Sequence, residues 1–273
     1  MKIKVQMVKV FGICKDYGNL AAIIIEEEDI SRKAKQNIAR IIGVSETVFI
    51  KLEENTAITM EYYTPNREIG LCGHGTIGGL IALEEIGVRN DKNYIVNTKT
   101  GNIEMFKENQ IYFMKQKNPE VFPGPKMEEI IRALNTKKID KNLPIEIVST
   151  GVKDIIVPID SKESLKNIKI NSTYMEMLSE KYDVVGVHVF SKNNHEIYCR
   201  NFAPFYGIEE ECATGTSNGA LSAYLNRYYK EKSFEFKQGF FMNNPCLIYG
   251  KVVNKQIYIG GKGAIAEEKT LSY

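Results

Sequence analysis

A nine-residue motif occurs twice in the chain and constrains the fold more than any other feature. The two copies are CGHGTIGGL (72–80) and CATGTSNGA (212–220), and Cys, Gly, Thr and Gly coincide at four of the nine positions. Both copies continue into an apolar helical pattern, and the offset of 140 residues is about half of the 273-residue chain. The repeat therefore indicates a duplication in which each half has one central, buried helix.

Short alternating or β-branched segments dominate the rest of the chain and predict strands. These segments include 1–10, 20–27, 47–53, 57–63, 93–98, 110–115, 183–190, 196–202, 247–253 and 255–261. Helical spacing predicts further helices over 31–42, 127–134 and 174–182. Many strands and few helices favour an α+β protein of two pseudo-symmetric halves, each a strongly curved sheet wrapped around a central helix.

A proline-rich segment separates the two halves. NPEVFPGP (118–125) contains three of the eight prolines in the chain, which makes it the best candidate for a linker. The expected organisation is an N-terminal half over 1–118 with the Cys72 helix, a linker over 119–125 and a C-terminal half over 126–262 with the Cys212 helix. Residues 263–273 are expected to form a C-terminal tail.

Composition argues against several classes of function. The chain has 36 basic and 34 acidic residues, so a net charge of +2 gives no reason to expect a nucleic-acid partner. No apolar segment approaches the roughly 20 residues of a membrane span, and the alternating N-terminus does not resemble a signal peptide. Five widely spaced cysteines argue against a disulfide framework, and no zinc-site spacing occurs, so no metal is expected. We expect a cytoplasmic protein with reduced thiols.

The repeated cysteines, Cys72 and Cys212, stand at the starts of Gly-rich helices. A helix N-terminus carries partial positive charge and unpaired N–H donors, which stabilise a thiolate and bind carboxylates. If the halves face each other, one thiolate can remove the α-proton of an amino acid while the other thiol protonates the opposite face. Backbone amides would hold the substrate carboxylate and the developing enediolate. The expected amides are those of Gly73, His74, Gly75, Thr214, Gly215 and Thr216.

Two other interpretations of the cysteine pair remain. A cysteine before a helix is more often a small buried residue than a catalytic one. Two facing thiols can also form a redox pair, although the sequence has no C-x-x-C motif. The matched Gly-rich helix starts favour the catalytic interpretation, because glycine lets the backbone approach a ligand closely.

Five segments, in order over nearly the whole chain, resemble the phenazine-biosynthesis isomerase-like family. They are YGNLAAIII (17–25), VSETVFI (44–50), YYTPNREIGLCGHGT (62–76), NFAPFYGIEEECATGTS (201–217) and FKQGFFMNNP (236–245). The resemblance implies the diaminopimelate epimerase fold, in which two pseudo-symmetric halves have an active site between them.

The resemblance also implies site residues. The Glu of Ser-Glu-Thr serves as acid/base in that family, which corresponds to Glu46, and the His of Cys-Gly-His corresponds to His74. An acidic residue precedes Pro-Ala-Thr-Gly at the position of Glu211. The early Gly-Asn helps to hold the substrate in diaminopimelate epimerase, which points to Asn19.

The sequence departs from that family at one informative place, where Cys212 replaces the Pro of Asp-Pro-Ala-Thr-Gly. Two cysteines at these positions resemble diaminopimelate epimerase and proline racemase instead. We therefore expect a cofactor-independent amino-acid racemase or epimerase that uses Cys72 and Cys212 and needs no metal. The alternatives are a phenazine-type isomerase that moves a proton in an unsaturated acid, with Glu46 as acid/base, and a non-catalytic binder of carboxylate metabolites. A homodimer is compatible with each.

Overall fold

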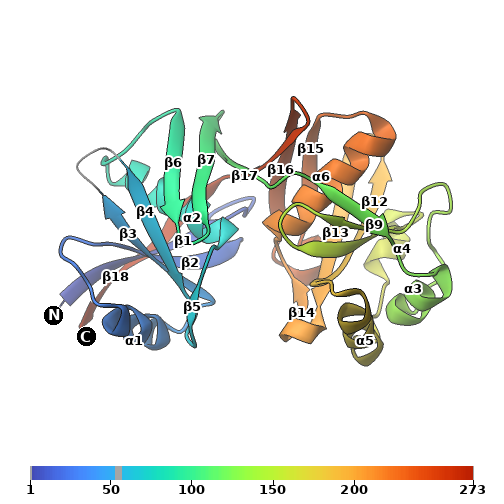
Figure 1. The fold of residues 1–273 in the computed structure, drawn as a ribbon, viewed down its shortest axis with the longest axis horizontal. Helices are drawn as coiled ribbons and strands as arrows, with labels where there is room; N and C mark the ends of the chain where they lie inside the picture. Colours follow the sequence, from blue (N-terminus) through green and yellow to red (C-terminus); the bar gives the residue numbers. More distant parts are fainter. Residues whose placement is uncertain (1, 53–56, 273) are drawn as a thin grey trace. The chain divides into compact units, whose positions relative to one another are not determined.

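The computed structural model describes residues 2–52 and 57–272, and the chain divides into two compact units (Figure 1). Unit 1 consists of Met1–Lys115 and Gly260–Tyr273, and unit 2 is the intervening segment Gln116–Ile259. Each unit is built around one sheet that packs on a central helix. The predicted mixed architecture of two similar halves is confirmed.

Unit 1 consists of a mixed sheet, the central helix and a second, shorter helix. Its elements are β1 (Lys2–Val10), β2 (Asn19–Ile25), α1 (Arg32–Ile42), β3 (Glu46–Leu52), β4 (Ile58–Tyr63), β5 (Glu68–Ile69), α2 (Gly73–Glu85), β6 (Asn93–Thr98), β7 (Gly101–Glu108), β8 (Ile111–Lys115) and β18 (Gly263–Ser272). The strands pair in the order β18-β1-β2-β3-β4-β6-β7-β8, and β5 pairs with β4. The pairs β2–β3 and β4–β6 are parallel, and the others are antiparallel.

Unit 2 has the same plan. Its elements are β9 (Glu120–Pro123), α3 (Met127–Leu134), β10 (Glu146–Ser149), β11 (Lys153–Pro158), α4 (Lys162–Lys166), α5 (Ser172–Tyr182), β12 (Gly186–Asn193), β13 (Glu196–Ala203), η1 (Pro204–Tyr206), β14 (Ile208–Glu211), α6 (Gly215–Tyr229), β15 (Ser233–Gln238), η2 (Phe240–Met242) and β16 (Cys246–Val253). The strands pair in the order β9-β10-β11-β12-β13-β15-β16, and β14 pairs with β13. Strand β17 (Gln256–Gly261) contains the boundary between the units.

The order of pairings confirms the duplication. Strands β1, β2, β3, β4, β6 and β7 correspond in succession to β10, β11, β12, β13, β15 and β16, with the same alternation of antiparallel and parallel pairs. A short strand, β5 or β14, then precedes the central helix in each unit. A parallel pair needs a crossover, and α2 and α6 supply it between β4 and β6 and between β13 and β15.

The central helix of unit 1 is buried because its side chains from Gly75 to Leu83 are apolar or small on every face. All residues of α2 from Gly75 to Leu83 are buried, and the helix contacts β1, β2, β3, β8 and β18. Close packing depends on glycine: a Cβ atom on Gly79 would lie 2.7 Å from the Cε atom of Met60. Helix α6 likewise contacts β10, β11 and β16 within unit 2.

Two details of the expected organisation are corrected. The segment 119–125 is no linker, because it contains β9, in which Glu120 pairs with Ser149 and Pro123 with Glu146. Prolines are tolerated in a sheet at exposed edge positions, and β9 is exposed along its whole length. The expected tail 263–273 contains β18, which pairs with β1 over nearly its full length. The unit boundaries therefore fall at 115/116 and 259/260 rather than at 118 and 262.

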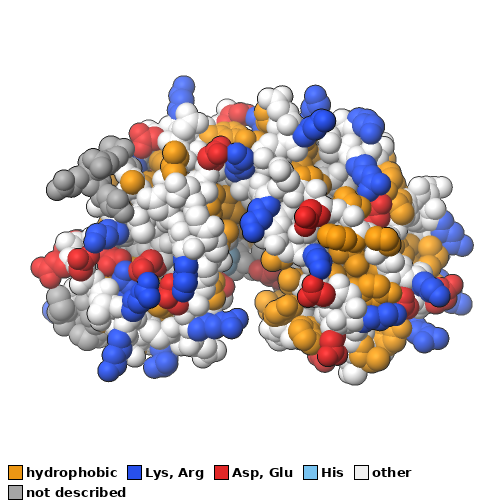
Figure 2. Space-filling model, in the orientation of Figure 1, with side chains coloured by type: hydrophobic (Ala, Val, Ile, Leu, Met, Phe, Trp, Pro, Cys, Tyr) orange, Lys and Arg blue, Asp and Glu red, His pale blue; other side chains and the backbone are white. Residues whose placement is uncertain are grey.

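Charged side chains of both signs are interspersed on the visible face of each unit (Figure 2). This pattern agrees with the near-neutral net charge of +2. Among the described residues, none of the helices is both long and apolar enough to cross a lipid bilayer.

Candidate active site

Cys72 caps the N-terminus of the central helix of unit 1. Its backbone is extended, with φ −136° and ψ 116°, and its Sγ atom accepts a hydrogen bond from the backbone N–H of Gly75 at 3.3 Å. A helix leaves its first N–H groups without backbone partners, so the sulfur takes the place that a Ser or Asp oxygen usually occupies. A Cβ atom on Gly75 would lie 2.8 Å from Val48 Cγ2 and 3.2 Å from Cys72 Sγ, so a larger residue there would force one of these side chains to move.

The backbone of Cys72 is fixed as firmly as its side chain. Its carbonyl accepts hydrogen bonds from both the N–H and the Oγ1 of Thr76, at 2.9 Å and 2.7 Å. The Oγ1 of Thr76 is also 2.8 Å from the hydroxyl of Tyr62, and both of these side chains are buried. Cys72 itself is only 8% exposed. The thiol is therefore held in one position by a buried polar network.

His74 lies between Cys72 and Glu46. Its Nδ1 atom is 3.4 Å from Cys72 Sγ, and its Nε2 atom is 3.2 Å from Glu46 Oε2. Glu46 begins β3, whereas the other two residues belong to the start of α2, so the fold brings them together from distant positions. The side chains of His74 and Glu46 are 12% and 19% exposed. The structure therefore brings three of the predicted site residues together.

Electrostatics within the cluster favour a protonated His74 ring beside an ionised Glu46. Burial by itself would lower the pKa of His74, but the charge and hydrogen bonding of Cys72 and Glu46 raise it well above its ordinary value. Burial opposes ionisation of Glu46 as well, but the contact with His74 keeps the pKa of its carboxyl below the usual value. The Oε2 atom of Glu46 has this charge partner but no aligned hydrogen bond, although it is buried.

Asn19 begins β2, the strand that pairs in parallel with β3. Two residues later, Ala21 stands opposite Glu46 in the parallel β2–β3 pair. The preceding residue, Gly18, has φ +123°, and a Cβ atom there would lie 2.6 Å from the carbonyl oxygen of Val10. This turn requires glycine and directs the chain into β2 at Asn19.

The second copy of the motif is held differently. Thr214 is the N-cap of α6, but its Oγ1 atom donates to Glu211 Oε2 at 2.6 Å instead of capping the helix. Cys212 is partly exposed and lies two residues before this cap, whereas Cys72 is itself the cap of α2. The two motifs therefore match in sequence without matching in capping geometry. Gly215 and Thr216 form the first turn of α6.

Gln238, which the sequence reasoning overlooked, organises this second loop. Its Oε1 atom accepts from the backbone N–H of Thr214 at 3.2 Å and from Nδ2 of Asn218 at 2.7 Å. Its Nε2 atom donates to the carbonyl of Glu211 at 2.8 Å and to Thr214 Oγ1 at 3.1 Å. The side chain is fully buried at the end of β15. The segment FKQG (236–239) was quoted for its family resemblance, but nothing local in it reveals this role.

A fully buried carboxyl lies beneath the same helix. Asp154 of β11 accepts a hydrogen bond from Ser217 Oγ at 2.8 Å, and its other oxygen has no partner. Burial raises the pKa of Asp154 to about 7, and the charge of Glu211 adds to this effect. Nearby, burial lowers the pKa of His188 to about 4, so that ring is neutral. Neither residue was a sequence candidate.

Cys212 has a thiol neighbour in its own unit. A hydrogen bond with Cys212 raises the pKa of Cys246, and burial raises it further, so Cys246 remains protonated. Cys246 begins β16, opposite Gln238 in the β15–β16 pair. No disulfide joins any of the five cysteines, all of which lie among the described residues.

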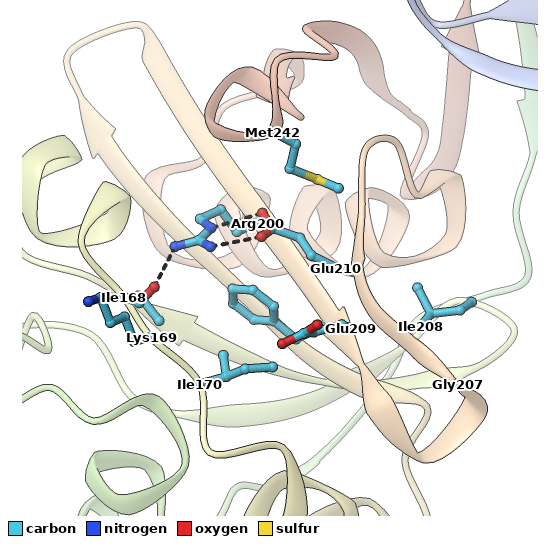
Figure 3. Close-up of a pocket in the computed structure, with 10 residues that line it drawn as sticks. Ile168, Lys169, Ile170, Arg200, Gly207, Ile208, Glu209, Glu210 and Met242 are labelled. Carbon is cyan, nitrogen blue, oxygen red and sulfur yellow. Dashed lines mark hydrogen bonds and ion pairs between the residues drawn. The ribbon is translucent and has the colours of Figure 1, made fainter.

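The lining of a surface cavity in unit 2 includes none of the predicted site residues (Figure 3). Glu210 Oε2 accepts from Arg200 Nη2 there at 2.7 Å, and Arg200 Nη1 donates to the carbonyl of Ile168 at 2.9 Å. The lining residues are Ile168, Lys169, Ile170, Arg200, Phe202, Gly207, Ile208, Glu209, Glu210 and Met242. Arg200 and Glu210 neutralise each other, so neither charge is available to bind a ligand in this cavity.

One group of ligand-type side chains lies close together among the described residues. One ligand atom from each of Glu46, Cys72 and His74 lies within 4.8 Å of the other two, a spacing that could hold a cation. Cysteine and histidine spacing along the chain does not reveal this set, because the third member comes from β3.

Comparison with known proteins assigns the chain to a family. The family model for phenazine biosynthesis-like protein matches residues 8–269. An uncharacterized isomerase of Clostridium acetobutylicum is 34% identical over 242 residues, which cover 81% of this chain and 79% of that protein. The trans-2,3-dihydro-3-hydroxyanthranilate isomerase of Pseudomonas chlororaphis is 26% identical over 261 residues, or 90% and 91% of the two chains.

A solved structure supports the same assignment. The crystal structure of the Bacillus anthracis phenazine biosynthesis protein of the PhzF family matches with a TM-score of 0.88 and 25% identity over 100% of both chains. The fold expected from the resemblance, with two similar halves around central helices, is thereby confirmed. With a family match over nearly its whole length and a relative above 30% identity, the chain belongs to the phenazine biosynthesis-like protein family.

Proposed function

We propose that the protein is an isomerase that inverts the α-carbon of an amino acid without a cofactor, with Cys72 and Cys212 as its two bases. The observation that carries this proposal is the position of Cys72 at the start of α2. Its sulfur accepts the N–H of Gly75 and lies beside the ring of His74. Such surroundings stabilise a thiolate, which is the form that can take a proton from carbon.

The substrate carboxylate is assigned to backbone amides at the two helix starts. Two of the six expected amides already have partners, because Gly75 donates to Cys72 and Thr214 donates to Gln238. The proposal therefore assigns the carboxylate to the remaining four, on Gly73, His74, Gly215 and Thr216. Fixed N–H dipoles stabilise the enediolate that forms when the α-proton leaves, so the reaction needs no pyridoxal phosphate as an electron sink.

The acidic residues have supporting roles in this reaction. Glu46 holds the His74 ring next to Cys72, and Glu211 accepts the hydroxyl of Thr214 in the loop that carries Cys212. Asn19, at the start of β2, is assigned to substrate binding. Each base then works from one face of the α-carbon, so a proton removed by one thiolate is replaced by the other thiol.

A second candidate is an isomerase that moves a proton within an unsaturated acid, with Glu46 as acid/base and no catalytic role for Cys212. One observation favours it: the contact with His74 keeps the pKa of the Glu46 carboxyl below its usual value, so Glu46 is in the carboxylate form that can accept a proton from carbon. The Pseudomonas chlororaphis relative, named trans-2,3-dihydro-3-hydroxyanthranilate isomerase, supports the same reaction class. In either case the protein is an isomerase.

Proton exchange in D₂O separates these functions. The purified protein is incubated with pooled amino acids, and α-deuterium and optical purity are measured by mass spectrometry and chiral chromatography. The proposal predicts deuterium incorporation together with loss of optical purity in at least one amino acid. Conversion of trans-2,3-dihydro-3-hydroxyanthranilate without amino-acid exchange would establish the second candidate. Binding of amino acids with neither reaction would identify a non-catalytic carboxylate binder.

A further inference from the structure

Two cysteine side chains of unit 2 meet at the loop before α6. Cys246 is the first residue of β16 and stands directly opposite Gln238 in the antiparallel β15–β16 pair. Residues that are directly opposite in such a pair have their side chains on the same face of the sheet. The side chain of Gln238 points at the loop, because it bonds the carbonyl of Glu211 and the N–H of Thr214. Cys246 therefore faces that loop as well.

The loop itself packs Cys212 against the end of β15. A Cβ atom on Gly239 would lie 3.1 Å from Cys212 Cβ and 2.8 Å from the carbonyl oxygen of Cys212, so glycine is what allows this close approach. The Cys246 thiol donates to the carbonyl of Asn244 at 3.3 Å, and a further hydrogen bond joins it to the thiol of Cys212. The two sulfurs are therefore neighbours within one folded unit.

The two thiols differ in their access to solvent. Cys212 is partly exposed, whereas Cys246 is buried. A small oxidant in solution therefore reaches Cys212 first and meets Cys246 only through it. Reversible thiol oxidation has this arrangement, in which an accessible cysteine stands next to a second cysteine that resolves its oxidised form.

The remaining cysteine of unit 2 provides an internal comparison. Cys199 pairs with Gln238 across the parallel β13–β15 pair, so it lies in the same row as Cys246 but on the other side of Gln238. Two strand spacings, about 9.6 Å in all, therefore separate the Cα atoms of Cys199 and Cys246. A disulfide needs Cα atoms within about 7 Å of each other. Cys199 therefore cannot replace Cys212 as the partner of Cys246.

We propose that Cys212 and Cys246 are a redox-active dithiol, which a hydroperoxide converts to a reversible disulfide. The Cys212 thiolate attacks one oxygen of the peroxide, the O–O bond breaks, and Cys212 becomes a sulfenic acid. The displaced hydroxide takes up the proton that the Cys212 thiol released. The Cys246 sulfur then attacks the Cys212 sulfur, the S–O bond breaks, and the leaving hydroxide takes the proton of Cys246. Two thiols and one hydrogen peroxide thus give one disulfide and two waters.

This assignment goes beyond the proposed isomerase and does not depend on it, because it uses unit 2 alone. It has a consequence for the proposed reaction, in which Cys212 is one of the two bases. A sulfur in a disulfide has no proton to give and cannot act as a thiolate base. The oxidised protein should therefore lose the proposed activity, and a dithiol reductant should restore it.

Peptide mapping tests the pair without any substrate. The reduced full-length protein is treated with a small molar excess of hydrogen peroxide, unfolded in N-ethylmaleimide to block the remaining thiols, and digested without reductant. We expect an intact mass lower by two hydrogen atoms before blocking, and one linked peptide pair that contains Cys212 and Cys246. Dithiothreitol should separate the pair. Oxidation of Cys212 to the sulfinic acid without a bridge, or a bridge from Cys212 to any other cysteine, would overturn the assignment.

Matched variants assign the two roles. Cys246→Ser keeps a hydroxyl for the carbonyl of Asn244 but cannot form the bridge, so the sulfenic acid at Cys212 should persist and be trapped by dimedone. In the wild type the bridge should form before dimedone reacts. Cys199→Ser removes a cysteine that is equally buried in the same row of the sheet and should form the bridge as the wild type does. Circular dichroism verifies that each variant is folded.

Two outcomes for the variants would refute the pair. One is equal labelling of Cys212 by dimedone in the wild type and Cys246→Ser, and the other is loss of the bridge in folded Cys199→Ser. If Cys246→Ser does not fold, the mapping of the wild-type protein still decides. Proton exchange is measured separately on the fully reduced protein, so a failure of the isomerase proposal is distinguishable from a failure of this one.

Discussion

The Sγ atom of Cys72 accepts a hydrogen bond from the backbone N–H of Gly75 at 3.3 Å, so the thiol of the first motif is itself the cap of the buried helix α2. This arrangement links the stability of the helix start to the position of the proposed base. The position of the Cys72 sulfur therefore depends on the residue at 75 as well as on the cysteine itself.

The first prediction concerns that glycine. Gly75→Ala would introduce a Cβ atom 2.8 Å from Val48 Cγ2 and 3.2 Å from Cys72 Sγ, so either the sulfur or β3 must move. We expect a loss of about 1–3 kcal/mol in the free energy of unfolding, measured by urea denaturation, because overpacking a core has that cost. Gly73→Ala is the matched control, since its Cβ atom would meet only the flexible end of Met114, at 3.2 Å. Equal losses in the two variants would contradict this account.

A second prediction concerns Gln238. Gln238→Leu removes the hydrogen bonds of Gln238 to the Thr214 N–H and to the Glu211 carbonyl, and it removes one of the two acceptors of Asn218 Nδ2, whose other acceptor is the Thr214 carbonyl. We expect the variant to lose about 2–4 kcal/mol in the free energy of unfolding, since each unsatisfied buried group costs about 1–3 kcal/mol. Gln238→Glu keeps both acceptor contacts but loses the donor to the Glu211 carbonyl and places a carboxyl at a fully buried position, so it should be destabilised as well. If Gln238→Leu unfolds at the same urea concentration as the wild type, the loop is held by other contacts.

The third prediction is a pH dependence from Asp154. Its folded-state pKa of about 7 lies above the ordinary value of 3.8, so the native protein keeps a proton that the unfolded chain releases. The stability from this group is complete below about pH 4 and is lost as the pH rises through 7. Between pH 5 and pH 8 the loss is about 3 kcal/mol, at 1.36 kcal/mol for each pKa unit.

Asp154→Asn is the matched variant for that effect. The amide cannot ionise, but its oxygen can still accept the hydroxyl of Ser217. We expect the difference in unfolding free energy between wild type and variant to shift by about 3 kcal/mol, in favour of the variant, from pH 5 to pH 8. Urea denaturation at the two pH values measures this shift. A difference that does not change with pH would show that Asp154 is already ionised at pH 5.

The duplicated motif was sufficient to predict the architecture. Its Gly-rich, apolar pattern marks both buried helices, and alternating segments mark the strands that surround them. The linker at 119–125 was wrong because prolines usually interrupt strands, whereas β9 is exposed and tolerates them. The tail was wrong because the exposed strand β18 is held by backbone pairing with β1, which leaves little hydrophobic pattern in the sequence.

The candidate site was only partly predictable. Cys72 and His74 are two residues apart, and the resemblance added Glu46, which the structure brings to them from β3. Asp154, Gln238 and Cys246 were missed because each reaches the α6 start from a different strand. Contacts of that kind follow from long-range strand pairing, which no local pattern of residues encodes.

The central claim is that Cys72 and Cys212 are the two bases of a racemase. The most direct measurement is the rate of α-deuteration and inversion of an accepted amino acid in D₂O by wild type, Cys72→Ser, Cys212→Ser and the control Cys14→Ser. A hydroxyl is a far weaker base than a thiolate, so the account predicts that each of the first two variants racemises at least about 100-fold more slowly. Cys14→Ser, which changes an exposed thiol outside the site, should match the wild type. Racemisation near the wild-type rate in either Cys72→Ser or Cys212→Ser would contradict the two-base mechanism.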